Sequence, residues 1–383
     1  WGNVFVNGLY REATNFINLN LNSPTEKGYL GRLQADGTFA WVGDVDSFLF
    51  ASAMVADGYG NLHLLGSSLD NVYRKQIWMR YDTLGNPLGY HQLDGCRIHD
   101  AEVDDHGHVI IVGVMDNDLE IDGTVVLTNP NPSPANAMIA GFVLKYDPFN
   151  DTFLWGQVIY SDNSGAGIAN ANSVSIDGQG NTFVSGRFRH DTVRIGNIAT
   201  AFNSLGPSWQ SNSFLAALDV NGSPQWVVSG ASINFGEIAA NDNGEVYCSG
   251  TASGFNTTPP GLVVLMDTTF TVPSNQNQPF LLKVDATGQR IGLHLESATT
   301  SISNSAITLN PVGEPILVNQ VYSDITIMGN LLSANNISSI YVQKFDADLN
   351  PEWAKFGQGG SVAPNTNWGV SGANVVADPF GNY

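Results

Sequence analysis

Basic residues are scarce in this sequence. There are 15 Lys and Arg against 35 Asp and Glu, which leaves a formal net charge of −20 over 383 residues. A nucleic-acid partner needs a positive surface against its phosphates, so we expect no nucleic acid to bind. Long-range repulsion opposes any polyanion, which favours neutral or cationic partners, or anions bridged by divalent ions.

Cysteine is also scarce, and long apolar runs are lacking. Cys96 and Cys248 lie 152 positions apart, which allows a disulfide but favours two buried or half-buried free thiols. No apolar run approaches the ~18 residues of a membrane-spanning helix, so we expect no transmembrane segment. Hydrophobic residues make up 43% of the chain, which excludes a disordered protein and supplies a large core.

One motif recurs along the whole chain. An apolar residue precedes Asp or Asn, Gly follows three residues after it, and an alternating stretch then usually ends in Gly. The pairs are Asp57/Gly60, Asp104/Gly107, Asp177/Gly180, Asn241/Gly244, Asn310/Gly313 and Asp378/Gly381. Residues 1–10 match the second half of the motif, with Gly2 in the glycine position. Repeats of this kind indicate a modular architecture.

A second motif lies between successive copies of the first and places a basic residue two positions before Asp. The pairs are Arg80/Asp82, Lys145/Asp147, Lys283/Asp285 and Lys344/Asp346. Arg32 precedes Gln34 instead, and Ala217 replaces the basic residue before Asp219. Four tryptophans recur nine or ten residues after the basic position: Trp41, Trp155, Trp226 and Trp353. Repetition at one strand position predicts that they pack between neighbouring repeats.

Both motifs predict β-hairpins. An Asp or Asn side chain accepts a backbone N–H two residues on, Gly supplies the positive φ, and alternating apolar residues form the strands. Two hairpins give four strands per repeat, and a shorter fifth strand is predicted in the linkers 118–127, 191–197 and 323–330. Helical periodicity is nowhere convincing.

Six four-stranded sheets in tandem must stack to bury their faces, which predicts an all-β, six-bladed β-propeller of antiparallel blades. The chain is then a single domain, 1–383, with repeats at about 2–59, 60–106, 107–179, 180–243, 244–312 and 313–380. The strand before Asp378 is predicted to pair with residues 4–9 and close the ring. Part of a seven-bladed ring remains the alternative.

Three stretches resemble the bacterial β-propeller repeat family known as the seven-bladed β-propeller repeat. They read SIDGQGNTFVSGRF, FLLKVDATG and YVQKFDADLNPEWAKFGQGG. The resemblance implies an exported bacterial protein, extracellular or at the cell surface, in many members delivered by type IX secretion. Adhesion or scaffolding is the role it suggests, and it implies no catalytic residues.

Two segments suggest metal ligands. In a strand, Asp116, Asp118, Glu120 and Asp122 would point one way about 7 Å apart, which suits a solvated edge and makes them weak calcium candidates. His106 and His108 could ligate a metal from a hairpin, but the sequence identifies neither a further donor nor an orienting partner. We therefore predict no resident metal or cofactor, with calcium as the weak exception.

The remaining candidates are ligand-binding aromatics in blade-specific insertions. Trp209 lies in the insertion 202–212, and Trp368 lies in the insertion 357–372. No nucleophile, acid and base can be assembled from spacing, so the chain is predicted not to be an enzyme. We predict a non-catalytic extracellular module that binds protein or glycan at a loop face. The alternative is a carbohydrate-binding or carbohydrate-active propeller, such as a lectin, glycosidase or lyase.

Overall fold

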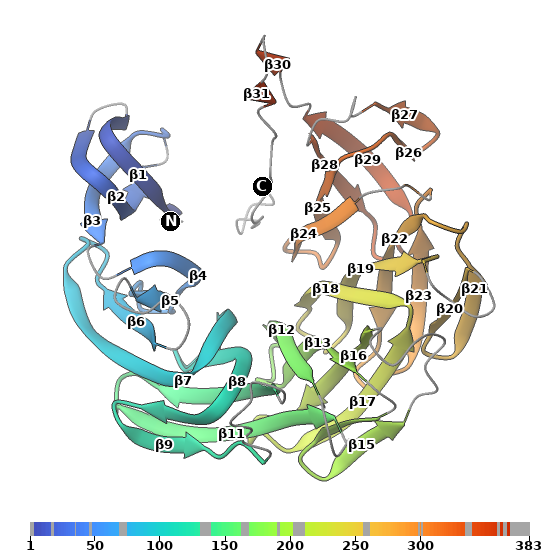
Figure 1. Ribbon diagram of the computed structural model, residues 1–383, viewed down its shortest axis with the longest axis horizontal. Coiled ribbons are helices and arrows are strands. Elements are labelled where there is room, and N and C mark those ends of the chain that lie inside the picture. Colours follow the sequence, from blue (N-terminus) through green and yellow to red (C-terminus); the bar gives the residue numbers. More distant parts are fainter. Residues whose placement is uncertain are drawn as a thin grey trace. The chain divides into compact units, whose positions relative to one another are not determined.

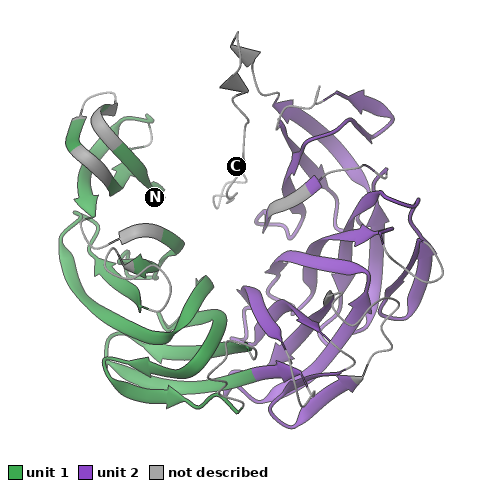
Figure 2. Cartoon of the chain, viewed as in Figure 1, with its two compact units in different colours: residues 1–158 green, residues 159–383 purple. Residues whose placement is uncertain are grey.

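The computed structural model describes most of the chain, in two compact units (Figure 2). The described residues are 4–16, 19–34, 36–45, 48–68, 75–130, 139–161, 168–189, 192–201, 211–255, 261–297, 299, 302–333, 339–357, 361–362 and 366–367. Unit 1 is Trp1–Val158 and unit 2 is Ile159–Tyr383. All regular elements of the described segments are β-strands, so the predicted all-β class is confirmed. These segments contain no helix that is long and apolar enough to cross a membrane.

The strands of unit 1 form two sheets (Figure 1). The first contains β1 (Val4–Phe16), β2 (Leu19–Leu33) and β3 (Phe39–Val45). The second begins with β4 (Phe48–Ala56), β5 (Leu62–Ser68), β6 (Lys75–Tyr81) and β7 (Pro87–Val103). It continues with β8 (Val109–Ile121), β9 (Thr124–Leu127), β10 (Ala140–Asp147) and β11 (Thr152–Ser161), the last of which runs on into unit 2.

Unit 2 repeats one four-stranded antiparallel pattern (Figure 1). The three copies are β12 (Ala169–Ile176), β13 (Thr182–Arg189), β16 (Ser211–Leu218) and β17 (Pro224–Ala231); β18 (Ile233–Ala240), β19 (Val246–Ser253), β22 (Asn277–Val284) and β23 (Arg290–Leu295); and β24 (Ile302–Leu309), β25 (Pro315–Val321), β28 (Ser339–Phe345) and β29 (Pro351–Gly357). The two predicted hairpins per repeat are therefore confirmed in these three sheets.

Short hairpins occupy the linkers between the second and third strands. In unit 2 they are β14 (Thr192–Ile195) with β15 (Ile198–Ala201), β20 (Leu262–Leu265) with β21 (Thr268–Thr271), and β26 (Ile325–Ile327) with β27 (Asn330–Leu332). A further pair, β30 (Ser361–Val362) and β31 (Thr366–Asn367), follows β29. The predicted extra strand is thus confirmed in all three linkers, although in 118–127 it is the end of β8 paired with β9.

Two of the short hairpins of unit 2 also pair with the last strand of the preceding repeat, β14 with β11 and β20 with β17, whereas β26 and β27 form a separate two-stranded sheet. The sequence did not indicate this pairing. Gly230 of β17 pairs with Leu265 of β20, and these two strands belong to different repeats. In unit 1, Leu93 near the start of β7 pairs with Ile121 at the end of β8. Each contact covers an otherwise open strand edge, which protects the sheet from unwanted pairing.

In two of the three four-stranded sheets of unit 2, the first strand has an irregular pairing opposite the glycine that follows the Asp-x-x-Gly motif. In the third, β24 shifts its register between Asn304 and Ala306, and Asn304 faces Asn319. In β12 the register shifts between Ala171 and Ser173, where Ala171 faces Gly186. In β18 it shifts between Phe235 and Ile238, where Phe235 faces Gly250. A phenylalanine of the third strand lies over each glycine, Phe214 over Gly186 and Phe280 over Gly250. The glycine therefore leaves room for both a bulged backbone and a ring.

Neighbouring sheets of unit 2 meet through their first strands, since β18 lies beside both β12 and β24 (Figure 1). Serine hydroxyls of β12 accept backbone N–H groups of β18: Ser173 from Ile238 at 3.3 Å and Ser175 from Ala240 at 3.0 Å. One core cluster spans the two sheets, from Phe183 and Leu215 to Phe235 and Leu282. The predicted stacking of adjacent four-stranded sheets is confirmed for these sheets, and their contact through the first strands is a feature that the sequence did not specify.

The remaining predictions about the fold are in part wrong, in part confirmed and in part untested. Two strands expected to be separate merge in β7, which pairs with β6 up to Asp94 and with β8 from Leu93 onward. Cys96 and Cys248 are buried free thiols, as favoured. The predicted closing strand before Asp378 lies outside the described residues, so closure and the number of blades stay predictions. Within the described part, residues 4–9 pair with β2.

Candidate functional site

The Asp-x-x-Gly hairpins share one hydrogen-bond pattern. In the hairpin of Asp177, Oδ1 accepts the backbone N–H groups of Gln179 at 2.9 Å and Asn181 at 2.8 Å. Oδ2 accepts the Asn181 side-chain amide at 2.7 Å, and Gly180 has φ +82°. The same acceptor pattern recurs at Asp57, Asp82, Asp104, Asp219, Asn241, Asp285, Asn310 and Asp346. The predicted structural role of these residues is confirmed, except at Asp378, which is outside the described residues.

In three repeats the recurrent basic residue is a lysine that forms an ion pair with an acidic residue of the first hairpin of its own repeat. Lys145 Nζ lies 2.7 Å from Asp104 Oδ2, and both side chains are almost fully buried. The corresponding distances are 3.0 Å from Lys283 to Glu245 and 2.6 Å from Lys344 to Glu314. Acidic residues of the same repeat therefore neutralise these lysines.

A second set of contacts joins neighbouring repeats within each unit. The acceptor is the backbone carbonyl of the residue that follows Asp in the second hairpin of the next repeat. The carbonyl of Thr83, after Asp82, accepts hydrogen bonds from Arg32 at 2.9 Å and from Trp41 at 3.2 Å. Trp226 donates in the same way to Ala286 at 2.9 Å, and its ring lies against Gly288. The predicted inter-repeat packing is thus confirmed for Trp41 and Trp226.

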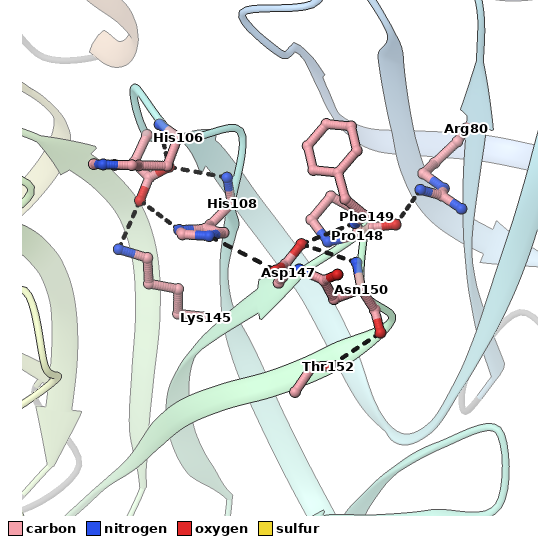
Figure 3. Close-up of polar contacts among 10 residues, drawn as sticks. Arg80, His106, His108, Lys145, Asp147, Pro148, Phe149, Asn150 and Thr152 are labelled. Carbon is pink, nitrogen blue, oxygen red and sulfur yellow. Dashed lines mark hydrogen bonds and ion pairs between the residues drawn. The ribbon is translucent and has the colours of Figure 1, made fainter.

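Two further donors use the same acceptor position. Lys283 donates to the carbonyl of Ala347 at 3.3 Å, and Arg80 donates to that of Pro148 (Figure 3). A long donor that leaves its own repeat and bonds a backbone carbonyl of the next repeat fixes the spacing of the two repeats. These side chains consequently act in assembly of the repeats.

One cluster has the donor set of a metal site. Ligand atoms of Asp104, His106 and His108 all lie within 4.8 Å of one another, the only such group of three found in the described part of the chain. The two imidazole rings stack 5.7 Å apart and 9° from parallel. Figure 3 shows His106, His108 and Lys145 around this point. The third donor that the sequence did not identify is Asp104 itself.

Asp104 is already committed within that cluster. Its Oδ2 accepts Lys145 at 2.7 Å and lies 3.0 Å from His108 Nδ1, while His108 Nε2 lies 3.9 Å from Asp147. Burial alone would raise the pKa of Asp104, but the hydrogen bonds from Lys145 and His108 hold it below its usual value. A cation would have to displace the Lys145 ammonium, so the residues present do not fit a resident metal.

The acidic segment 116–122 differs from the prediction in one respect. β8 ends at Ile121, and Asp122 occupies a turn with φ +51°, so the four carboxylates do not share one strand face. Asp122 accepts the backbone N–H of Gln92 at 2.9 Å and lies 2.8 Å from His91 Nδ1. Asp118 accepts the backbone N–H of Asn129 at 2.9 Å. These carboxylates, with Asp116 and Glu120, form no compact ligand group, and calcium stays an untested prediction.

Trp209 and Trp368, the predicted ligand-binding aromatics, lie outside the described residues. Unit 2 instead presents a cavity of about 470 Å³ that the sequence did not single out. Its lining includes Asp177, Asn181, Ala217, Asp219, Trp226 and Thr287. The sequence signal that could have found it is the missing basic residue at position 217.

Two half-buried carboxyls on first strands have no role in the hairpins. Burial raises the pKa of Glu102 to about 7, and burial also raises the pKa of Glu237. The native state thus retains a proton on Glu102 at pH values where the unfolded chain, with a pKa near 4.5, has lost it.

We expect the free energy of unfolding to fall as the pH rises from about 4.5 to about 7, because the native state binds the extra proton. Glu102→Gln should remove this slope and stabilise the protein at pH 8 by on the order of 2 kcal/mol, at about 1.36 kcal/mol per pKa unit and allowing for solvent screening. Urea denaturation from pH 4.5 to 8 measures both. An unchanged slope in the variant would contradict the prediction.

Comparison with known proteins gives weak similarities. No protein-family model matches the sequence, and no curated protein matches it. Among solved structures, the Dos1 propeller has a TM-score of 0.42 and 10% identity, over 85% of this chain and 65% of that one. A Bacteroides caccae protein of unknown function has a TM-score of 0.31 and 9% identity, over 70% and 90%. An apocarotenoid oxygenase from Synechocystis has a TM-score of 0.39 and 12% identity, over 87% and 70%. Similarities of this size assign neither a family nor an activity to the chain.

Proposed function

We propose that the chain is a non-catalytic binding or scaffold module of β-propeller type, exported to the cell surface or beyond as part of a larger protein or assembly. The observation that supports binding most directly is the cavity of about 470 Å³ beside Asp177, Asp219 and Trp226. It lies at hairpin ends, and connecting loops at the ends of a rigid scaffold are where repeat proteins usually carry ligand sites.

The polar groups of the cavity suit binding better than proton transfer. Asp177 uses both carboxylate oxygens in its own turn. Asp219 accepts two backbone N–H groups with Oδ1 and the Gln225 amide, at 3.2 Å, with Oδ2. Carboxylates held by several donors keep a fixed orientation. The repetition of the same turn in other repeats marks this turn as part of the scaffold.

A paired binding and turnover screen tests this function. The purified chain is assayed for saturable binding to a glycan array and to a panel of proteins of different net charge, and in parallel for hydrolase and lyase activity on polysaccharides. We expect binding to at least one class without turnover. Glycan binding without turnover would identify a lectin-like module. Turnover that disappears when one carboxylate is replaced would overturn the non-catalytic proposal and support the carbohydrate-active alternative.

The ring belongs to the same proposal. A strand near Asp378 that pairs with residues 4–9 would join both ends of the chain in one blade and remove two open edges. Deletion of residues 372–383 should then lower the melting temperature by several degrees, measured by circular dichroism. An unchanged melting temperature after this deletion would argue against closure.

A further inference from the structure

The cavity of unit 2 lies where the other repeats hold a basic side chain. In every complete repeat the basic position pairs with the sixth residue after the Asp or Asn of the first hairpin. Lys145 pairs with Ile110, Lys283 with Tyr247 and Lys344 with Ile316. Ala217 pairs with Phe183, which is the sixth residue after Asp177. The Cβ of Ala217 therefore stands where a lysine side chain starts in the other sheets.

The acceptors of that missing lysine are still present. Asp177 corresponds to Asp104, whose Oδ2 binds the Lys145 ammonium at 2.7 Å. Ala286 corresponds to Ala347, whose carbonyl accepts Lys283 at 3.3 Å. The carbonyl of Ala286 accepts the Trp226 indole at 2.9 Å, and a carbonyl oxygen has a second lone pair. Asp177 and Ala286 both line the cavity, so the two partners of a lysine ammonium lie around an open space.

The remaining walls suit an alkyl chain that ends in a cation. Phe183 and Trp226 supply apolar surface along the cavity, and Asp219 adds a second carboxylate. A volume of about 470 Å³ lies within the roughly 300–1,000 Å³ of ordinary ligand sites. The net charge of −20 attracts cations over long range. An anion would face Asp177 and Asp219 with no basic residue at position 217 to offset them.

We propose that this cavity binds a primary alkylammonium group, supplied by a lysine side chain of a partner protein, which completes in trans the ion pair that the other repeats form internally. The inference deepens the proposed binding function and rests on it. A lysine side chain and a free small amine both carry an ammonium group on a flexible alkyl chain. Asp177 and the Ala286 carbonyl would hold this ammonium group in either case.

Three probes distinguish the sources. They are n-butylamine, the peptide acetyl-Gly-Lys-Gly-amide, and the same peptide with an Nε-acetylated lysine, titrated by isothermal calorimetry and ligand-observed NMR. We expect the lysine peptide to bind with a millimolar dissociation constant and the acetylated peptide to bind at least tenfold more weakly. Added salt should weaken the binding of the lysine peptide. Tighter binding of the peptide than of n-butylamine supports a protein partner. Equal binding of the two overturns the partner and leaves a small-amine site.

Two variants locate the binding. Ala217→Lys should supply the ammonium internally, abolish peptide binding and raise the melting temperature. Asp177→Asn should weaken binding at least tenfold and leave the turn intact, because Asn241 and Asn310 form the same turn in other repeats. Asp346→Asn, in an exposed turn of the same type that does not line the cavity, is the matched control and should bind like the native chain.

The outcomes separate this inference from the proposed function. Unchanged peptide binding in Ala217→Lys, or a lowered melting temperature in that variant, would overturn the lysine site. If the native chain binds a ligand in the screen and Ala217→Lys binds it equally, the cavity inference fails while the binding module stands. If the lysine peptide binds at the cavity and a polysaccharide is also turned over, the site stands and the non-catalytic proposal fails.

Discussion

Replacement of Lys145 by Met should lower the free energy of unfolding by about 3–5 kcal/mol. The ammonium pairs with Asp104 at 2.7 Å, and the exposed fractions of the two side chains are 4% and 3%. Removing one member of a buried pair leaves the other as an uncompensated buried charge, which costs far more than the pair itself contributes. Chemical denaturation followed by tryptophan fluorescence measures the loss.

Two controls make this result specific. Lys283→Met disrupts the corresponding pair with Glu245, whose side chain is 30% exposed, and should cost only about 1 kcal/mol. Asp104→Asn in the Lys145→Met background removes the stranded charge and keeps the turn, as Asn241 does in its repeat, so most of the loss should be recovered. Equal losses at Lys145 and Lys283 would show that burial of the pair is not the cause.

Replacement of Gly186 by Ala should cost about 3 kcal/mol. A Cβ at this position would lie 2.0 Å from the backbone carbonyl oxygen of Asn170 and 2.6 Å from the Phe214 ring. Neither atom can move without disturbing the bulge between Ala171 and Ser173 or the core of the sheet. Thermal and urea denaturation of the variant measure the effect.

Gly43→Ala is the matched control, because no heavy atom lies within 4 Å of a Cβ at Gly43. This change should alter stability by no more than about 0.5 kcal/mol. Phe214→Leu in the Gly186→Ala background removes the ring contact but not the carbonyl contact, so it should recover only a small part of the loss. Full recovery would mean that the ring, and not the bulged backbone, requires the glycine.

The sequence by itself determined the local structure of the repeats. Asp177 and Gly180 predicted a turn in which a side chain accepts N–H groups and Gly adopts positive φ, and the structure has that turn. The alternation of Val, Ile and Phe around such turns predicted the strands. These features are local, since each depends on residues within a few positions of one another, and repetition along the chain made them easy to recognise.

Only the tertiary structure decided which side chains meet between distant segments. The pairing of β17 with β20, the donation from Trp226 to Ala286, and the two acids around Ala217 join residues tens of positions apart. Their meeting depends on strand register and on how neighbouring sheets pack, and neither is encoded in local spacing. Ala217 illustrates the difference. In the sequence it is a gap in a basic pattern, and in the folded chain the same gap becomes a cavity because the carboxylate of Asp177 and the carbonyl of Ala286 remain in place around it.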